Sequence, residues 1–287
     1  MSAAVALAIA SAFCFGLGLV LTQLGLRGIA PIAGAAISIP SSTLLFLAIA
    51  PFALHAADLS WTAVAIFAAV GLLYPATATL LTFEANRRIG PVLTGTFGNL
   101  APIFAVAIAV LVLGEPLRVL QVAGLTVILA GVMVLTMPHD GGPSHWRSAV
   151  LLLPLAAAAI RGLIQPAIKL GLAYWPSPYA ATSVSYVVSA LLVLAVARAR
   201  TGRWFVNATP RGQLTFVAVG ITNGLAVLLL YAALANGPVA LVSPLVATYP
   251  LATIVLGVLI LRRIEGGARL PGGVALTVIG VGLLIAG

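Results

Sequence analysis

One apolar stretch near the middle of the chain carries three polar residues whose types could bind an anion. Arg161, Gln165 and Lys169 follow one another at steps of four residues within the apolar segment 155–172. On an α-helix this spacing places them on one face, with a drift of about 40° per step. Pro166 removes a backbone hydrogen bond beside them and should kink the helix or open it locally. A polar stripe of this kind is typical of a helix that lines a cavity.

The composition around this stripe is that of a protein with many membrane spans. Of 287 residues, 62% are hydrophobic and only 7% are charged, whereas a soluble domain needs far more surface charge. The net charge of +9 does not indicate a nucleic-acid partner, because the basic residues lie in short breaks between apolar runs. Cys14 is the single cysteine and the three histidines lack ligand spacing, so we expect neither a metal site nor a cofactor.

Ten apolar segments are long enough to cross a bilayer, since about 20 helical residues span a hydrocarbon core of about 30 Å. The sequence therefore predicts an all-α integral membrane protein with ten transmembrane helices. The first run lacks the basic n-region of a cleaved signal peptide, so we expect it to be a membrane helix. The predicted spans are 3–25, 31–54, 61–84, 91–113, 119–137, 148–172, 178–197, 212–235, 239–261 and 270–286.

The two halves of the chain repeat each other. Ser38 matches Ser185, 147 residues later, within similar segments, and Pro102 matches Pro250, 148 residues later. The fifth and tenth spans each carry two glycines seven residues apart, which places both on one face for close packing. Because each repeat has an odd number of spans, the second must be inverted, with a binding site near the midplane between the halves. We predict a first repeat at 1–137, a linker at 138–147 and a second repeat at 148–287.

Residues 114–135, G-E-P-L-R-V-L-Q-V-A-G-L-T-V-I-L-A-G-V-M-V-L, look like the close of an EamA domain. The two halves resemble the paired EamA repeats of the drug/metabolite transporter superfamily, over essentially the whole chain. This resemblance implies ten helices, a central cavity and export of small metabolites. The second repeat departs from the pattern, because Glu265 is displaced from the place of Glu115. The arginine usual in the second helix of the family is also absent, and Pro40 lies near its place.

Basic residues gather on one side of the predicted membrane. The breaks after the odd-numbered spans hold eleven of them, and the opposite side holds only Arg118 and Lys169. The positive-inside rule then makes these breaks cytoplasmic and both termini external, although members of the superfamily are more often drawn with their termini inside. We expect a multi-pass protein of a bacterial inner membrane, as a monomer or a homodimer.

Two structural explanations compete with a role for the polar stripe in binding. Arg161 lies about 20 Å along its helix, near mid-bilayer, where an arginine costs roughly 2.5–3.5 kcal/mol. It could pair with Glu84 or with carbonyl groups at a helix end. Lys169 could extend its ammonium group to the membrane surface.

Acidic residues point to the class of substrate. Four of the five lie in predicted loops, and Glu84 ends the third span. The proton-coupled exporters of cations in this superfamily rely on a glutamate in the first helix, which this chain lacks. A cavity with Arg161 and no such carboxylate favours an anionic or zwitterionic substrate, such as an amino acid. Glu84 is the candidate proton carrier, but uniport and substrate exchange are equally open.

Further polar residues near predicted helix breaks are candidates for the cavity wall. Tyr74 precedes Pro75, and two others, Asn99 and Tyr249, approach the matched prolines. A hydrogen bond between helices explains each one alone equally well, whereas their clustering near the midplane favours contact with a substrate. The remaining candidates are Gln23, Tyr186, Asn223 and Tyr231.

These observations favour a secondary transporter whose two inverted halves rock about a central site that holds a small-molecule substrate. A flippase for a lipid-linked carrier is the alternative within transport. An integral-membrane enzyme would need a metal cluster, a nucleophile–base set or an acid/base pair inside the membrane, and the sequence has no such motif. A phosphate-binding Gly-rich loop followed by Lys-Ser/Thr is also missing, which argues against direct use of ATP.

Overall fold

The computed structural model describes residues 2–26, 29–54, 59–89, 94, 97–136, 148–202, 209–261 and 270–287. Within these ranges the chain is helical and contains no strand. The first half forms α1 (Ser2–Gly25), α2 (Pro31–Ala53), α3 (Trp61–Gly71), η2 (Leu72–Thr77), α4 (Ala78–Ile89), α6 (Ala101–Leu113) and α7 (Val119–Thr136). The second half forms α8 (Ser148–Tyr174), α9 (Pro178–Thr201), α10 (Pro210–Asn236), α11 (Val239–Val246), α12 (Tyr249–Leu256), η3 (Gly257–Leu261) and α13 (Leu270–Ala286).

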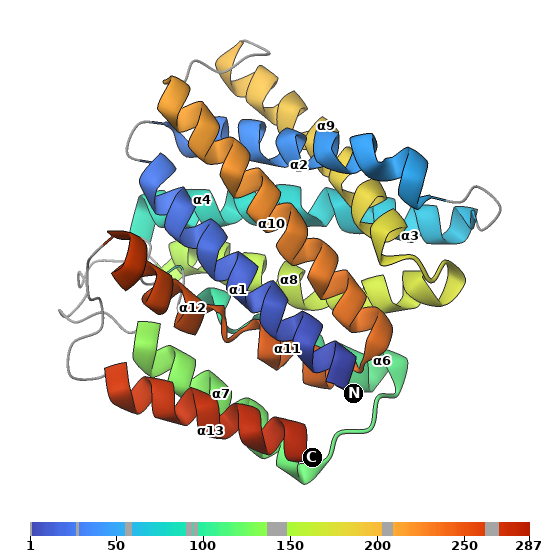
Figure 1. Ribbon diagram of the computed structural model, residues 1–287, viewed down its shortest axis with the longest axis vertical. Helices are drawn as coiled ribbons and strands as arrows, with labels where there is room; N and C mark the ends of the chain where they lie inside the picture. Colours follow the sequence, from blue (N-terminus) through green and yellow to red (C-terminus); the bar gives the residue numbers. More distant parts are fainter. Residues whose placement is uncertain are drawn as a thin grey trace.

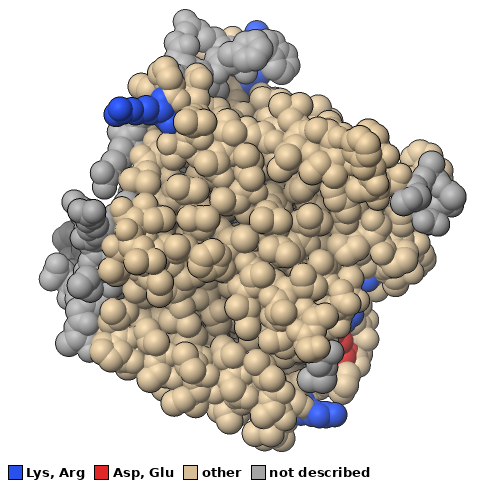
Figure 2. Space-filling view, viewed as in Figure 1, with Lys and Arg blue, Asp and Glu red and all other residues tan. Residues whose placement is uncertain are grey.

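The helices are those of a multi-pass membrane protein. Among the described residues, seven helical runs are long and apolar enough to cross a bilayer, and three shorter apolar helices correspond to the other predicted spans. Large apolar side chains such as Phe52 and Leu111 are more than four-fifths exposed, at 86% and 82%. Figure 2 shows a face almost free of charge, with Lys and Arg at its margins, as contact with lipid requires. The count of ten spans remains a prediction, and the linker 138–147 lies outside the described residues.

Helix ends follow from local chemistry. The hydroxyl groups of Ser177 and Thr209 accept the backbone N–H groups of Ala180 and Gly212, and in both helices proline follows the cap. These are the residue types that best satisfy the free N–H groups of a first turn. Gly114 ends α6 with a φ of 64°, a conformation that glycine adopts without a steric penalty.

The two halves exchange equivalent contacts. Helix α2 packs against α10, while α9 packs against α3 and η2. The hydroxyl of Ser42 donates to the carbonyl of Gly220 at 2.7 Å, and that of Ser189 donates to the carbonyl of Gly71 at 2.5 Å. The two serines are 147 residues apart and the two glycines 149, so the packing repeats with the offset found in the sequence.

A second pair of contacts obeys the same offset. A Cβ on Gly16 of α1 would lie 3.0 Å from the carbonyl oxygen of Tyr249, and one on Gly162 of α8 would lie 2.8 Å from that of Ala101. Only a residue without a side chain lets these backbones approach so closely. Figure 1 shows α7 and α13 side by side at one edge of the molecule, and the matched glycines of the two helices face each other's backbone, which confirms the predicted close packing.

Helix breaks occur at the matched prolines. Leu100 precedes α6 with φ −78° and ψ −8°, and Thr248 precedes α12 with φ −76° and ψ 1°. The predicted span 239–261 is present as one apolar helical run, Val239–Ile260, and the chain turns within it at Ala247 and Thr248, between α11 and α12, beside the matched proline. Pro102 and Pro250 are the second residues of α6 and α12, a place where a helix has no internal partner for the N–H that proline lacks.

Two further breaks were predicted, and one of them is present. Tyr74 has φ −144° and ψ 135°, which interrupts the helical run between α3 and α4 and confirms a break before Pro75. Helix α8, in contrast, continues from Ser148 to Tyr174 through Pro166. The expected local opening is therefore wrong, since neighbouring helices allow a membrane helix to tolerate the loss of one hydrogen bond, and the alternative of a kink at Pro166 stays a prediction.

The two termini lie on the same side of the molecule, as Figure 1 shows. The end of α9, with Arg198 and Arg200, lies on the opposite side. Several other arginines on which the orientation depends, including Arg27 and Arg147, are outside the described residues. Which side faces the cytoplasm remains a prediction.

Candidate binding cavity

A cavity of about 230 Å³ lies between the two halves. Helices α1, α2, α4 and α6 of the first half and α8 to α12 of the second contribute to its wall, together with η2. This volume is just below the range of roughly 300–1,000 Å³ typical of pockets for drug-sized ligands. The cavity therefore suits a small solute.

Seven of the predicted site residues line this cavity. They are Tyr74, Asn99, Arg161, Gln165, Tyr186, Asn223 and Tyr249. Residues that were singled out by two different sequence signals, helical spacing and proximity to helix breaks, thus line the same cavity. Gln23, Lys169 and Tyr231 are not among the lining residues.

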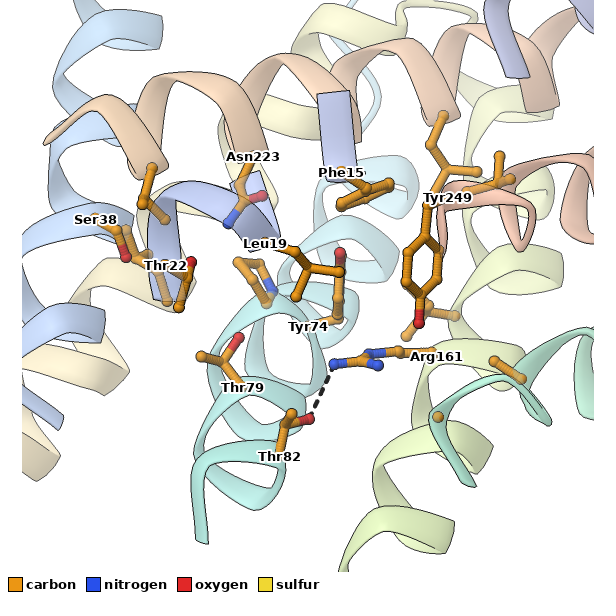
Figure 3. Close-up of a pocket in the computed structure, with 18 of the residues that line it drawn as sticks. Phe15, Leu19, Thr22, Ser38, Tyr74, Thr79, Thr82, Arg161, Asn223 and Tyr249 are labelled. Carbon is orange, nitrogen blue, oxygen red and sulfur yellow. Dashed lines mark hydrogen bonds between the residues drawn. The ribbon is translucent and has the colours of Figure 1, made fainter. Parts of the chain in front are cut away.

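Arg161 is the one charged group among the described residues of the cavity wall. Its Nη2 atom donates to the Thr82 hydroxyl oxygen at 2.9 Å, and its Nη1 atom lies 3.3 Å from where a Cβ on Gly98 would stand. A guanidinium group has five N–H donors, and within the described residues this is its one side-chain hydrogen bond. Glu84 pairs with Arg88 at 2.6 Å, and neither ion pair of the described residues includes Arg161. Figure 3 shows the guanidinium pointing into the cavity between Thr82 and Tyr249.

Two interrupted helices begin beside this arginine. Asn99, Ala101 and Pro102 line the cavity at the start of α6, and Ala247 and Tyr249 line it at the start of α12. Neither helix start has a side-chain cap. A helix N-terminus carries a partial positive charge, so these two ends add to the attraction of Arg161 for an anion, although the N–H groups of Ile103 and Leu251 already donate to the carbonyls of Leu100 and Thr248.

Asn99 and Tyr249 link the two starts. The Tyr249 hydroxyl donates to Asn99 Oδ1 at 2.9 Å, and the Asn99 side chain is almost fully buried. Because one residue comes from each half, this bond joins the repeats at the site where both helices are broken. The matched prolines were the sequence signal for it.

Lys169 lies in a cluster of its own, the Glu115 cluster, formed by Glu115, Lys169 and the backbone of Gly237, Val239 and Ala240. The Lys169 ammonium donates to Glu115 Oε1 and to the Gly237 carbonyl, both at 2.8 Å. The Glu115 carboxylate also accepts the N–H groups of Val239 at 3.0 Å and Ala240 at 3.1 Å, which begin α11. Lys169 therefore pairs with an acid from the other half instead of facing the cavity.

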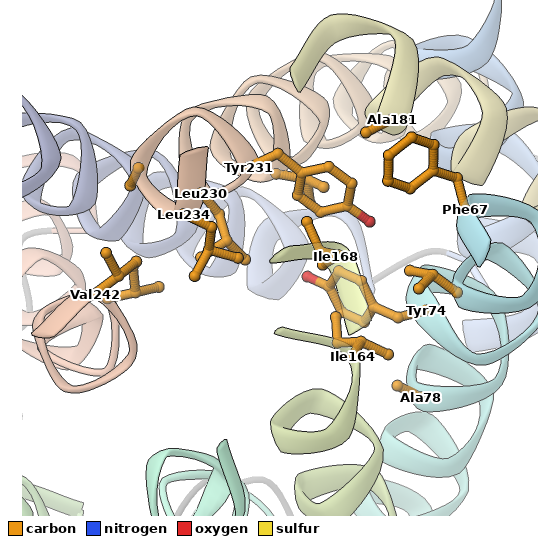
Figure 4. Close-up of a cluster of buried hydrophobic side chains, with 14 of the residues drawn as sticks. Phe67, Tyr74, Ala78, Ile164, Ile168, Ala181, Leu230, Tyr231, Leu234 and Val242 are labelled. Carbon is orange, nitrogen blue, oxygen red and sulfur yellow. The ribbon is translucent and has the colours of Figure 1, made fainter. Parts of the chain in front are cut away.

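The other two residues outside the cavity have different surroundings. Tyr231 is fully buried and donates to the Ser185 hydroxyl oxygen at 3.3 Å. Figure 4 shows it within the apolar cluster that also contains Ile168 and Phe67. Gln23 is exposed near the end of α1. Glu84, the candidate proton carrier, does not line the cavity either.

Sequence reasoning missed the small hydroxyl residues of the wall. Thr82 holds Arg161, and the wall also contains Thr22, Ser38, Ser42 and Thr79. The Thr82 hydroxyl also donates to the Ala78 carbonyl one turn earlier, at 2.7 Å. Threonine in a membrane helix commonly makes this bond, so its presence alone gives no sign of a site.

A helical membrane protein with a cavity between two similar halves has the architecture expected of a membrane transporter. The EamA-like transporter family matches residues 2–137 and 147–286, so the chain belongs to this family and carries two repeats of it. A solved structure titled "Crystal structure of protein" is 21% identical, covers 99% of this chain and 96% of its own, and has a TM-score of 0.84. Likeness at that identity shows a shared fold. The comparison with curated proteins found no match.

Proposed function

We propose that the protein is a secondary transporter that exports small anionic or zwitterionic metabolites, such as amino acids, and that Arg161 binds the substrate carboxylate. The observation that carries this proposal is the position of the Arg161 guanidinium group in the cavity wall. It donates one side-chain hydrogen bond, to Thr82, within the described residues. Direction of transport follows family likeness alone.

The charge of Arg161 needs a partner that the described wall does not contain. A cation held within a membrane is costly unless a counter-charge or water compensates it. A carboxylate can accept two parallel hydrogen bonds from a guanidinium group, which gives both strength and orientation. The starts of α6 and α12 lie beside the same place and favour negative charge there.

Alternating access is the mechanism that the arrangement supports. The proposal includes ten spans in two inverted repeats, a bacterial inner membrane and external termini. Contacts exchanged between the halves at a constant offset are what a two-fold axis between inverted repeats produces. Motion of one half against the other would then expose the same cavity to each side in turn.

We infer that the cavity is closed on the side of the termini. On α1 it is lined by Phe15, Leu19 and Thr22, whereas Ala4 and Ala8, nearer the N-terminus, are fully buried. A Cβ on Gly237, at the end of α10, would lie 2.6 Å from the Cβ of Ala4. The Glu115 cluster joins the two halves at the same end of α10. We infer that this cluster holds the terminus side shut in the state described here.

The test is binding by the purified protein, followed as thermal stabilisation by a panel of amino acids, organic acids, nucleobases and cationic dyes. A ligand that binds only the folded state adds about 2.7 kcal/mol at a hundredfold excess over its Kd. We expect carboxylates to stabilise the wild type but not Arg161→Ala, with partial effect in Arg161→Lys, which keeps charge without the planar fork. Equal stabilisation of wild type and Arg161→Ala by cations would refute the proposal.

A further inference from the structure

We infer that the substrate is a monoanion with two different ends: a carboxylate that binds Arg161 and an uncharged hydrogen-bonding group that binds Asn223. This inference rests on the proposed function and narrows its substrate class. It excludes zwitterions and dicarboxylates as the preferred substrates.

The charge of the described wall supports the first part. Arg161 is the one charged residue among the described residues that line the cavity, and none of them is Asp or Glu. An ammonium group on the substrate would thus leave water without a carboxylate to pair with it, and such transfers are costly. The two helix starts beside the cavity also disfavour a second positive charge. A second carboxylate would likewise lack a second cation.

Asn223 is an amide with unused hydrogen-bonding capacity. It lines the cavity from α10, and it makes no hydrogen bond within the described part of the chain. Its carbonyl end packs against Gly18 of α1, where a Cβ would overlap Oδ1. The amide nitrogen lies farther from that Cβ position, at 3.5 Å, and Figure 3 shows Asn223 among the side chains of the cavity wall. Glycine at position 18 makes room for the amide, which leaves its donors available to a ligand.

Apolar side chains line part of the space between the two polar groups, next to the Tyr74 hydroxyl. Phe15 and Leu19 of α1 line the cavity, and Leu19 lies between Asn223 and Arg161 in Figure 3. The repeat explains this asymmetry, because Phe15 and Leu19 occupy the places that Arg161 and Gln165 occupy in the second half, each 146 residues later. One wall is therefore charged and the related wall is neutral. A substrate with two different ends fits such a cavity better than a symmetric one.

Matched acids that differ only at one end test the inference. The probes are γ-hydroxybutyrate, γ-aminobutyrate, succinate and butyrate, with the corresponding derivatives of hexanoate as a longer set. Each is titrated against the purified wild type, Arg161→Ala and Asn223→Leu, and its Kd is obtained from thermal stabilisation. We expect the hydroxy acid of one set to bind the wild type most tightly. Asn223→Leu should weaken the hydroxy acid about 2- to 13-fold, the effect of one neutral hydrogen bond, and leave the unsubstituted acid unchanged.

A gain of specificity provides a second test that a damaged protein could not mimic. Asn223→Asp places a carboxylate at the neutral end, so this variant should prefer the amino acid over the hydroxy acid, reversing the order in the wild type. Tightest binding of the amino acid or the dicarboxylate to the wild type, in an Arg161-dependent manner, would overturn the inference and leave the proposed function intact. If no acid binds, or if binding survives Arg161→Ala, both are overturned.

Discussion

Removing the carboxylate of Glu115 should destabilise the protein more than removing its ammonium partner. The carboxylate accepts three hydrogen bonds, at 2.8, 3.0 and 3.1 Å, and its side chain is only 9% exposed. In Glu115→Ala the first N–H groups of α11 lose their acceptor and Lys169 loses its counter-charge. Each N–H group left without its acceptor costs about 1–3 kcal/mol, so with the lost ion pair we expect about 3–5 kcal/mol in total.

Lys169→Met should cost less, although it breaks the same ion pair. The lysine side chain is 31% exposed, so water screens part of its attraction, and Glu115 keeps both N–H groups of α11. The variant loses two hydrogen bonds, to Glu115 Oε1 and to the Gly237 carbonyl, and because the ammonium group is partly exposed we expect a screened cost of about 1–2 kcal/mol. Thermal unfolding followed by tryptophan fluorescence should rank the proteins as wild type, then Lys169→Met, then Glu115→Ala.

The same variants report on the state of the terminus side. Ser11 is fully buried on α1, and its hydroxyl donates to the Ala226 carbonyl at 2.7 Å. In a Cys14→Ala background, Ser11→Cys should resist a membrane-impermeant maleimide while the Glu115 cluster is intact. Addition of Lys169→Met should make this cysteine reactive below the unfolding temperature. Unchanged labelling, or a Glu115→Ala protein as stable as the wild type, would refute the argument that this cluster holds the terminus side shut.

Three further perturbations test other parts of the site and the fold. Thr82→Val removes the hydrogen bond that orients Arg161 and should weaken carboxylate binding several-fold with little change in unfolding temperature, measured by titration. Glu84 lies outside the cavity lining and pairs with a neighbouring arginine, so Glu84→Gln should leave flux under a pH gradient unchanged; loss of that flux alone would make Glu84 the proton carrier. Gly162→Ala would press a Cβ against backbone at 2.8 Å and should cost about 1–3 kcal/mol, whereas Gly282→Ala, with open space around it, should stabilise by about 0.4–1 kcal/mol.

The membrane helices were predictable because the bilayer imposes their length and polarity. Helix α2 runs from Pro31 to Ala53 where 31–54 was predicted, and α1 ends at Gly25 as expected. Hydropathy identifies only the segments that are apolar enough to enter the bilayer. It does not report backbone geometry, so the apolar segment 239–261 gave no sign, apart from its prolines, that it divides at Thr248.

A site residue could be predicted from the sequence where its side chain has a high free-energy cost within the membrane. Arg161 is expensive within an apolar helix, and that cost singled it out. Lys169 was singled out by the same spacing, but its partner Glu115 lies 54 residues away in sequence, where Gly114 turns the chain. Pairings at such separation depend on tertiary packing, which spacing along one helix does not encode. Thr82 carries no comparable cost, because it bonds to its own helix.

Comparison of the two repeats separates packing from specificity. The serine and glycine contacts that join the halves recur at offsets of 147 and 149 residues, as a duplicated fold requires of its packing. Arg161 breaks this symmetry, since Phe15 stands at its place in the first half. A symmetric cavity would offer both ends of a substrate the same chemistry. Because the arginine is on one wall only, the two ends of the cavity differ in charge. The substrate must therefore carry its negative group at the Arg161 end in both of the states that transport requires.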